Sequence, residues 1–375
     1  MLTRRLTGFG FCGAVVLLFL VVGCGEPRGS GVFQKAHEQL SAGNLVVAKT
    51  MLERYVRANP GSPQIARAYN DLGVIDYRLG KSADAVGALE KSLGVDGSFA
   101  PAAYNRGVLA IQAGDLENGK NYLLHAANAA GSDARALLYA AFAQGRERDW
   151  GGAEVLLRQA RERDPSSAEI LTSLACAQIH VAGPDAARGT LDAALDVDPR
   201  YAPALFNLGV LHALWRGDLM NGVGYLEEYL EFGGDDTHAS QAMDLLVDLR
   251  VKLEEILVKE GAALLKKGEV EKALRAFQGA VAQREDSLGG HLGIAEAAMR
   301  FSPSEAVGVA LERALEIDPE NREAMWGIAV FFDQADDNAA AAIRQYQEFI
   351  REYPGDARTH AARERISVLS MARRE

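Results

Sequence analysis

Cysteine is scarce in this chain of 375 residues, which contains three: Cys12, Cys24 and Cys176. The first two lie in or beside an apolar N-terminal segment, so Cys176 is alone in the rest of the chain. A single thiol cannot form an intrachain disulfide, and we expect none in the mature protein even if it is exported. No histidine or asparagine forms a nucleophile pattern with Cys176, so we interpret it as a small buried hydrophobic residue.

The sequence also lacks the motifs of the common catalytic and metal sites. Seven histidines are scattered without an HExxH or another paired-ligand motif. There is no phosphate-binding loop and no GxSxG nucleophile motif. Asp333, Asp336, Asp337 and Asn338 crowd one turn, but the Gly and bidentate Glu of a calcium loop are missing. We therefore predict a protein that is not an enzyme and binds neither a cofactor nor a metal.

An excess of basic residues is absent as well. The net charge is −11, and the first 23 residues hold Arg4 and Arg5 but no acid, so the remainder carries −11 − 2 = −13. Binding to nucleic acid requires a basic face that neutralises phosphates. We therefore predict no nucleic-acid partner.

The N-terminus has the features of an export signal. Arg4 and Arg5 precede an apolar run from Phe9 to Val22, which is shorter than the roughly 20 residues of a spanning helix. Val21-Val22-Gly23-Cys24 resembles a bacterial lipobox, which implies cleavage before Cys24 and lipidation of its thiol. The alternatives are an uncleaved anchor or an ordinary signal peptide with an incidental cysteine. The lipobox predicts a signal peptide at 1–23, a lipidated Cys24 with a short linker at 24–31, and an outer-membrane anchor facing the periplasm, since Gly25 follows the cysteine.

The rest of the chain is built from one repeating pattern. Ala168–Tyr201 is typical of two short amphipathic helices, separated by Gly183-Pro184 and ended by Asp198-Pro199. A small residue in the middle of the first helix recurs with spacings, by subtraction, of 37, 34, 34, 34, 34, 52, 34 and 34; we call these residues the anchors: Ala36, Gly73, Gly107, Ala141, Ala175, Gly209, Gly261, Ala295 and Ala329. A large residue in the second helix recurs with them: Leu52, Leu89, Leu123, Leu157, Leu191, Leu226 and Phe277.

A 34-residue period of paired helices with these small and large columns resembles the tetratricopeptide repeat family. The resemblance covers about Ser30 to Glu375. It implies an all-α fold, an α-solenoid of about nine helix-turn-helix repeats, with a concave groove that binds partner proteins or peptides.

The spacing of 52 exceeds the period by 18 residues, about the length of one helix. Ser240 to Glu260 contains no Gly or Pro, so we predict one long helix from about His238 to Lys267. The predicted organisation is therefore a block of about six repeats at 32–236, an extra helix at 237–253 continuous with the next repeat, a block of about three repeats at 254–356, and a C-terminal capping helix at 357–375.

Residues three before, one after and four after each anchor share a helix face. The resemblance places that face on the concave side, where aromatic side chains are the better candidates for contact with a partner. Asparagine two residues before an anchor can hold a peptide backbone in this family. The candidate protein-binding residues are Asn70, Tyr77, Tyr104, Asn105, Phe142, Phe206, Asn207 and Trp326. The family's carboxylate clamp is not matched, because residues such as Phe33 and Val74 stand where it needs polar or basic groups.

These features predict a non-catalytic scaffold, a lipid-anchored protein that recruits or assembles cell-envelope proteins through its groove. Its partners would be proteins or peptides at the envelope, and the membrane through the anchor. Alternatives within this class are a pilotin-like assembly factor for a secretin or outer-membrane complex and a regulator of peptidoglycan enzymes. Outside it, a glycan- or peptidoglycan-binding module and a self-associating solenoid remain open.

Overall fold

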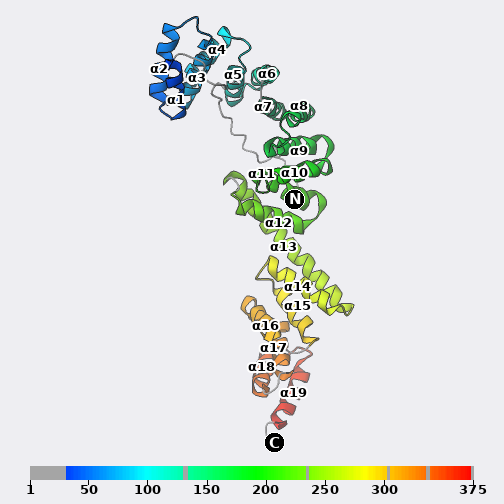
Figure 1. Cartoon of the computed structure of the whole chain (residues 1–375). Coiled ribbons are helices and arrows are strands. Elements are labelled where there is room, and N and C mark those ends of the chain that lie inside the picture. The colour runs from blue at the N-terminus through cyan, green and yellow to red at the C-terminus, as the bar shows by residue number, and fades with distance from the viewer. Residues whose placement is uncertain (1–30, 130–133, 234–235, 302–304, 335–337, 373–375) are drawn as a thin grey trace. The chain divides into compact units, whose positions relative to one another are not determined.

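The computed structural model describes residues 31–129, 134–233, 236–301, 305–334 and 338–372. The predicted signal peptide and Cys24 lie outside these residues. The chain divides into two compact units, Met1–Ala239 and Ser240–Glu375. In the described residues all regular structure is helical, which confirms the predicted all-α solenoid (Figure 1).

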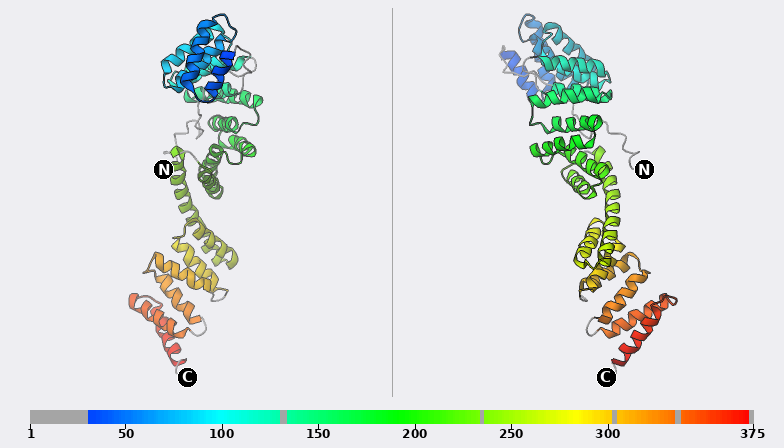
Figure 2. Two further views of the ribbon diagram at one scale, coloured as in Figure 1. Left: turned by 60° about the vertical axis from the view of Figure 1, so that its left-hand side comes forward. Right: turned by 90° about the vertical axis from the view of Figure 1, so that its right-hand side faces the viewer.

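The described residues of the first unit form six helical hairpins, which we call repeats one to six. Their helices are α1 (Gly31–Ser41) and α2 (Leu45–Ala58), α3 (Ile65–Arg78) and α4 (Ser82–Val95), α5 (Ala100–Gln112) and α6 (Leu116–Asn128), α7 (Arg135–Arg146) and α8 (Trp150–Arg163), α9 (Ala168–Ala182) and α10 (Pro184–Val197), and α11 (Ala202–Val210) and α12 (Leu219–Glu231). Figure 2 shows these hairpins stacked side by side along the unit.

In the second unit, the part of the chain that the structure describes forms three more hairpins and a final helix. α13 (Asp236–Lys266) begins in the first unit and continues as the first helix of repeat seven. The other helices are α14 (Val270–Gln283), α15 (Leu288–Met299), α16 (Glu305–Ile317), α17 (Arg322–Gln334), α18 (Ala339–Glu352) and α19 (Thr359–Ala372). The 31-residue α13 confirms the predicted long helix, and α19, which packs on α18, confirms the predicted C-terminal capping helix.

The anchors are small because a second helix packs directly against them. A Cβ atom added to Gly73 would lie 2.8 Å from Leu89 Cγ, and one added to Gly209 would lie 2.7 Å from Leu226 Cγ. These leucines belong to the large column predicted from the sequence, and both are fully buried. The two columns therefore meet inside each hairpin, where close packing leaves no room for another methyl group.

One repeat departs from the regular geometry. Repeat six has one extra residue around Leu214-Trp215, and there the end of its first helix widens into a π-helix, η2 (Leu211–Arg216). An inserted residue in an α-helix is commonly absorbed by a single wide turn of this kind. Trp215 remains 54% exposed beside it, so the insertion changes the surface, while Leu226 of α12 still packs against the anchor Gly209.

Candidate functional site

The first helices of the repeats form the inner side of the first unit. Successive first helices touch one another, α3 with α5, α5 with α7, α7 with α9 and α9 with α11, whereas no comparable contact joins successive second helices in the described residues. A stack whose elements are closer on one side curves toward that side. We call the surface built by α1, α3, α5, α7, α9 and α11 the inner face.

The predicted asparagines of the inner face lie between neighbouring first helices. Asn70, Asn105 and Asn207 are at most 1% exposed. Asn105 Nδ2 donates to Asn70 Oδ1 at 2.8 Å, and Asn207 Nδ2 lies 3.6 Å from Cys176 Sγ. In this arrangement the amide groups join one repeat to the next, and a partner's backbone would have to compete with these contacts.

Two predicted aromatic residues are also covered. Tyr104 is 5% exposed and its ring centroid lies 5.7 Å from that of Tyr139 in the next repeat. Phe206 is 6% exposed, with ring centroids of Tyr229 and His238 at 5.3 and 5.5 Å. Neighbouring helices therefore enclose both rings and leave little of their surface for a partner.

The other predicted aromatic residues keep part of their surface. Tyr77 of α3 and Phe142 of α7 are half-buried on the inner face of the first unit. Trp326 of α17 is half-buried in the second unit, where its ring centroid lies 5.6 Å from that of Tyr346 and 5.3 Å from that of Phe349. The structure thus brings Tyr77 and Phe142 to one face, and places Trp326 in a separate unit.

A row of polar residues on the inner face was missed from the sequence. The residues five after the anchors of repeats two to five are exposed: Arg78, Gln112, Arg146 and His180. The residue five after an anchor lies on the same helix face as the residue one after it, since the two are four apart. The helical period could therefore have identified these four polar residues. The Arg146 guanidinium carbon lies 5.8 Å from the centroid of the Phe142 ring, which places a cation beside the accessible aromatic side chain.

The acidic groups of the inner face are less accessible. Asp71 is fully buried, with His37 Nδ1 3.5 Å from its Oδ2. Burial raises the pKa of Glu169, and the Arg135 charge opposes that shift. The inner face of repeats two to five therefore presents cationic and donor groups in preference to carboxylates.

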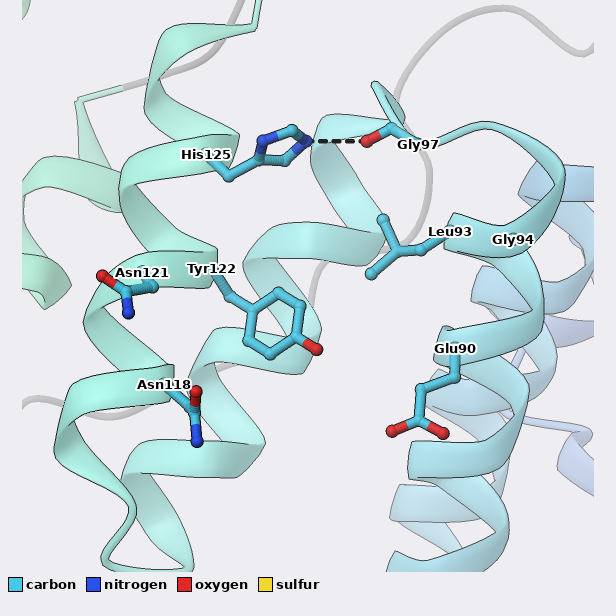
Figure 3. Close-up of a pocket in the computed structure, with 8 residues that line it drawn as sticks. All are labelled: Glu90, Leu93, Gly94, Gly97, Asn118, Asn121, Tyr122 and His125. Atoms are coloured by element: carbon cyan, nitrogen blue, oxygen red, sulfur yellow. Dashed lines mark hydrogen bonds between the residues drawn. The ribbon is translucent and has the colours of Figure 1, made fainter.

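On the opposite side, a shallow cleft of about 550 Å³ separates α4 from α6. Figure 3 shows Tyr122 projecting from α6 into the cleft and Glu90 lining it from α4, while His125 Nε2 donates to Gly97 O at 2.7 Å. A cleft of about 560 Å³ occurs between α2 and α4 as well. Since such clefts recur between successive second helices, we interpret them as a consequence of the stacking.

The described residues contain neither a cluster of metal ligands nor a membrane-spanning helix. No cluster of three or more His, Cys, Asp or Glu side chains could hold a metal ion there. Within the same ranges, every helix is too short or too polar to cross a membrane.

The comparisons with known proteins agree with the repeat seen in the structure. A sequence profile of the tetratricopeptide repeat matches residues 33–101, 71–119 and 303–357. The chain therefore carries tetratricopeptide repeats within residues 33–119 and 303–357. Proteins of this family are interaction scaffolds that typically lack catalytic activity, and their stacked repeats form extended binding surfaces.

Solved structures with the same repeat are only distantly similar. A tetratricopeptide repeat protein from Parabacteroides merdae is 17% identical, covering 72% of this chain and 97% of its own, with a TM-score of 0.47. YrrB, a repeat protein with an unusual peptide-binding site, is 18% identical over 52% of this chain and 97% of its own, with a TM-score of 0.43. PilW, a type IV pilus biogenesis factor, is 16% identical over 52% of this chain and 90% of its own, with a TM-score of 0.46. No curated protein matches the chain.

Proposed function

We propose that the protein is a non-catalytic scaffold of the bacterial cell envelope, which recruits or assembles envelope proteins through the inner face of its first unit. The observation that carries this proposal is the accessible aromatic surface of Tyr77 and Phe142 on that face. Large aromatic side chains contribute much of the binding energy of protein interfaces. Arg146 beside Phe142 adds a charged group that can orient a partner.

The second part of the proposal is a lipid anchor on Cys24, facing the periplasm at the outer membrane. It is supported by the apolar run that ends at Cys24 and by the polar tract that follows it. α1 begins at Gly31, and the seven residue steps from Cys24 to Gly31 span at most about 25 Å. The first repeat would therefore lie close to the membrane surface, and the partners would be proteins at or near that surface.

The proposal is tested by crosslinking the full-length protein in the membranes of its native host and identifying the products by mass spectrometry. A Tyr77→Glu, Phe142→Glu double variant should lose specific envelope partners, because it places two charges on the accessible apolar surface. The matched control is Val155→Glu, Val197→Glu, which adds the same charge at exposed positions of the second helices α8 and α10. Partners that persist in the inner-face variant, or that both variants lose alike, would contradict the assignment to the inner face.

A further inference from the structure

The row of Arg78, Gln112, Arg146 and His180 follows the ends of four first helices. Arg78, Gln112 and Arg146 are the last residues of α3, α5 and α7, and His180 is near the end of α9. All four side chains are exposed, and all can donate hydrogen bonds. Basic residues at helix C-termini also interact favourably with the helix dipole, so a position of this kind does not by itself indicate a ligand.

The second observation concerns the ion pairing of the two arginines in the row. No carboxylate in the described residues lies within ion-pair distance of Arg78 or Arg146, although Arg106, Arg158 and Arg216 of the same unit have carboxylate partners. In the adjoining turns, Glu147 pairs with Lys120 at 3.4 Å and Asp149 caps α8 by accepting from Gly152 N. Two unneutralised guanidinium groups therefore lie on the inner face of a chain whose net charge is −11.

The third observation is the equivalent placement of the two arginines. Arg78 follows Tyr77 in repeat two, and Arg146 follows Gly145 at the equivalent position in repeat four. In the row of first helices, α5 alone lies between α3 and α7. Packed helices are about 8–10 Å apart, so α3 and α7 are about 16–20 Å apart. An extended chain rises about 3.3 Å per residue and covers that distance in about six residues.

We propose that the inner face of the first unit binds an extended polypeptide segment that carries two acidic side chains about six residues apart. One carboxylate pairs with Arg78 and the other with Arg146, and Gln112 hydrogen-bonds to the segment between them. Side chains two apart on an extended chain point the same way, so an even spacing directs both acids to the row while apolar residues face Tyr77 and Phe142. This inference rests on the proposed function and specifies the chemistry of the partner. It requires acids within a chain and needs no free C-terminus.

The probe is a fluorescent peptide of alternating Val and Ser in which two Asp residues lie about six positions apart. Binding to the full mature protein in detergent is measured by fluorescence anisotropy. We expect the Arg78→Gln, Arg146→Gln double variant to bind about tenfold more weakly, since it loses two charge-assisted contacts at a solvent-exposed site. The matched control, Arg161→Gln, Arg188→Gln, removes the same charge from second helices and should bind as the wild type does.

Three results would overturn the inference: no binding of the Asp peptide, equal binding of a peptide with Asn in place of both Asp residues, or an equal loss in the control variant. The proposed function is tested separately by the crosslinking partners of the protein. If Tyr77→Glu, Phe142→Glu loses those partners while Arg78→Gln, Arg146→Gln keeps them, the scaffold stands and the acidic segment is wrong. If neither variant loses a partner, the inner-face proposal itself is wrong.

Discussion

Asn105 donates a hydrogen bond from its side-chain Nδ2 to Oδ1 of Asn70 in the preceding repeat, at 2.8 Å, and both side chains are fully buried. The residue two before the anchor is polar and buried in each of repeats two to six: Asp71, Asn105, Tyr139, Ser173 and Asn207. Because these side chains lie between neighbouring first helices, we interpret the column as a feature of repeat stacking.

Replacing Asn105 should therefore destabilise the protein whether or not a partner is present. Asn105→Ala removes the donor to Asn70 Oδ1 and should cost about 1–3 kcal/mol of unfolding free energy. The measurement is urea unfolding followed by circular dichroism. Asn121→Ala, at an exposed position of α6, serves as the control and should change little. Equal stability of the Asn105 variant and the control would contradict a structural role for the column.

The glycine anchors provide a second stability prediction. A Cβ added to Gly107 would lie 2.7 Å from Leu123 Cγ and 2.9 Å from Gly119 O, and the backbone oxygen cannot move aside. Gly107→Ala should therefore destabilise the protein by about 1–3 kcal/mol. Gly87→Ala in α4 meets nothing within 4 Å and should stabilise it by up to about 1 kcal/mol, the helix-propensity difference. Thermal unfolding of the two variants should shift in opposite directions, and a shift in the same direction would refute the close-packing account.

The fold was largely predictable because its determinants are local and repeated. The anchor spacing located the hairpins, and the stretch without Gly or Pro located α13, observed at Asp236–Lys266 against a predicted 238–267. The extra residue near Trp215 was visible as well. Its accommodation by a π-helix was not, because a longer turn between the helices would have satisfied the same spacing.

The candidate site was less predictable, because helical periodicity identifies a face and not its depth. Tyr104 and Phe206 are on the predicted face, but Tyr139, Tyr229 and His238 enclose them, and these contacts depend on how closely the neighbouring helices approach. Phe142 occupies a position one residue after its anchor and remains half-buried. Arg78 and Arg146 do not stand out in the sequence, because the repeat is defined by its small and apolar positions.

In the second unit, the capping helix is held by an ion pair between the exposed Arg365 and the largely covered carboxylate of Asp333, which should make its docking sensitive to acid. Arg365 Nε and Nη2 of α19 donate to the two carboxylate oxygens of Asp333 in α17 at 2.8 and 2.6 Å, and Tyr346 OH donates to Oδ2 at 2.9 Å. The Arg365 hydrogen bonds are the main reason that the pKa of Asp333 lies below its usual value. A lowered folded-state pKa means that the ionised carboxylate stabilises the folded state.

That contribution is present above the pKa of Asp in an unfolded chain, about 3.9, and is lost as the pH falls through the lower folded-state pKa. Arg365→Gln should therefore speed hydrogen exchange in α19 at pH 7, by an amount that corresponds to about 1 kcal/mol, because the Arg365 side chain is 46% exposed and solvent screens the pair. The difference from wild type should shrink in acid. Glu348→Gln removes an exposed partner of Arg351 and should leave exchange in α19 unchanged. A difference that persists undiminished in acid would refute the role of the Asp333 carboxylate.

The lipid anchor predicts a simple change in location. If the signal peptide is still processed, Cys24→Ser should move the protein from the membrane fraction to the soluble periplasmic fraction. If it is not processed, the variant should accumulate as an uncleaved precursor. Mass spectrometry of the wild-type N-terminal peptide should show acyl chains on Cys24. Cys12→Ser lies within the predicted signal peptide and should have no effect on the mature protein. An unmodified Cys24 in a membrane-bound wild-type protein would contradict the lipobox assignment.

The central claim, that the inner face of the first unit binds a protein, is tested most directly by photocrosslinking in the native host. A photoreactive amino acid is placed at Phe142 on the inner face and, in a separate strain, at Val155 on the outer surface of α8. The account predicts a discrete crosslinked partner from Phe142 and none from Val155, with the Phe142 product weakened by Arg78→Gln, Arg146→Gln. Crosslinks from Val155 alone, or identical products from both positions, would contradict it.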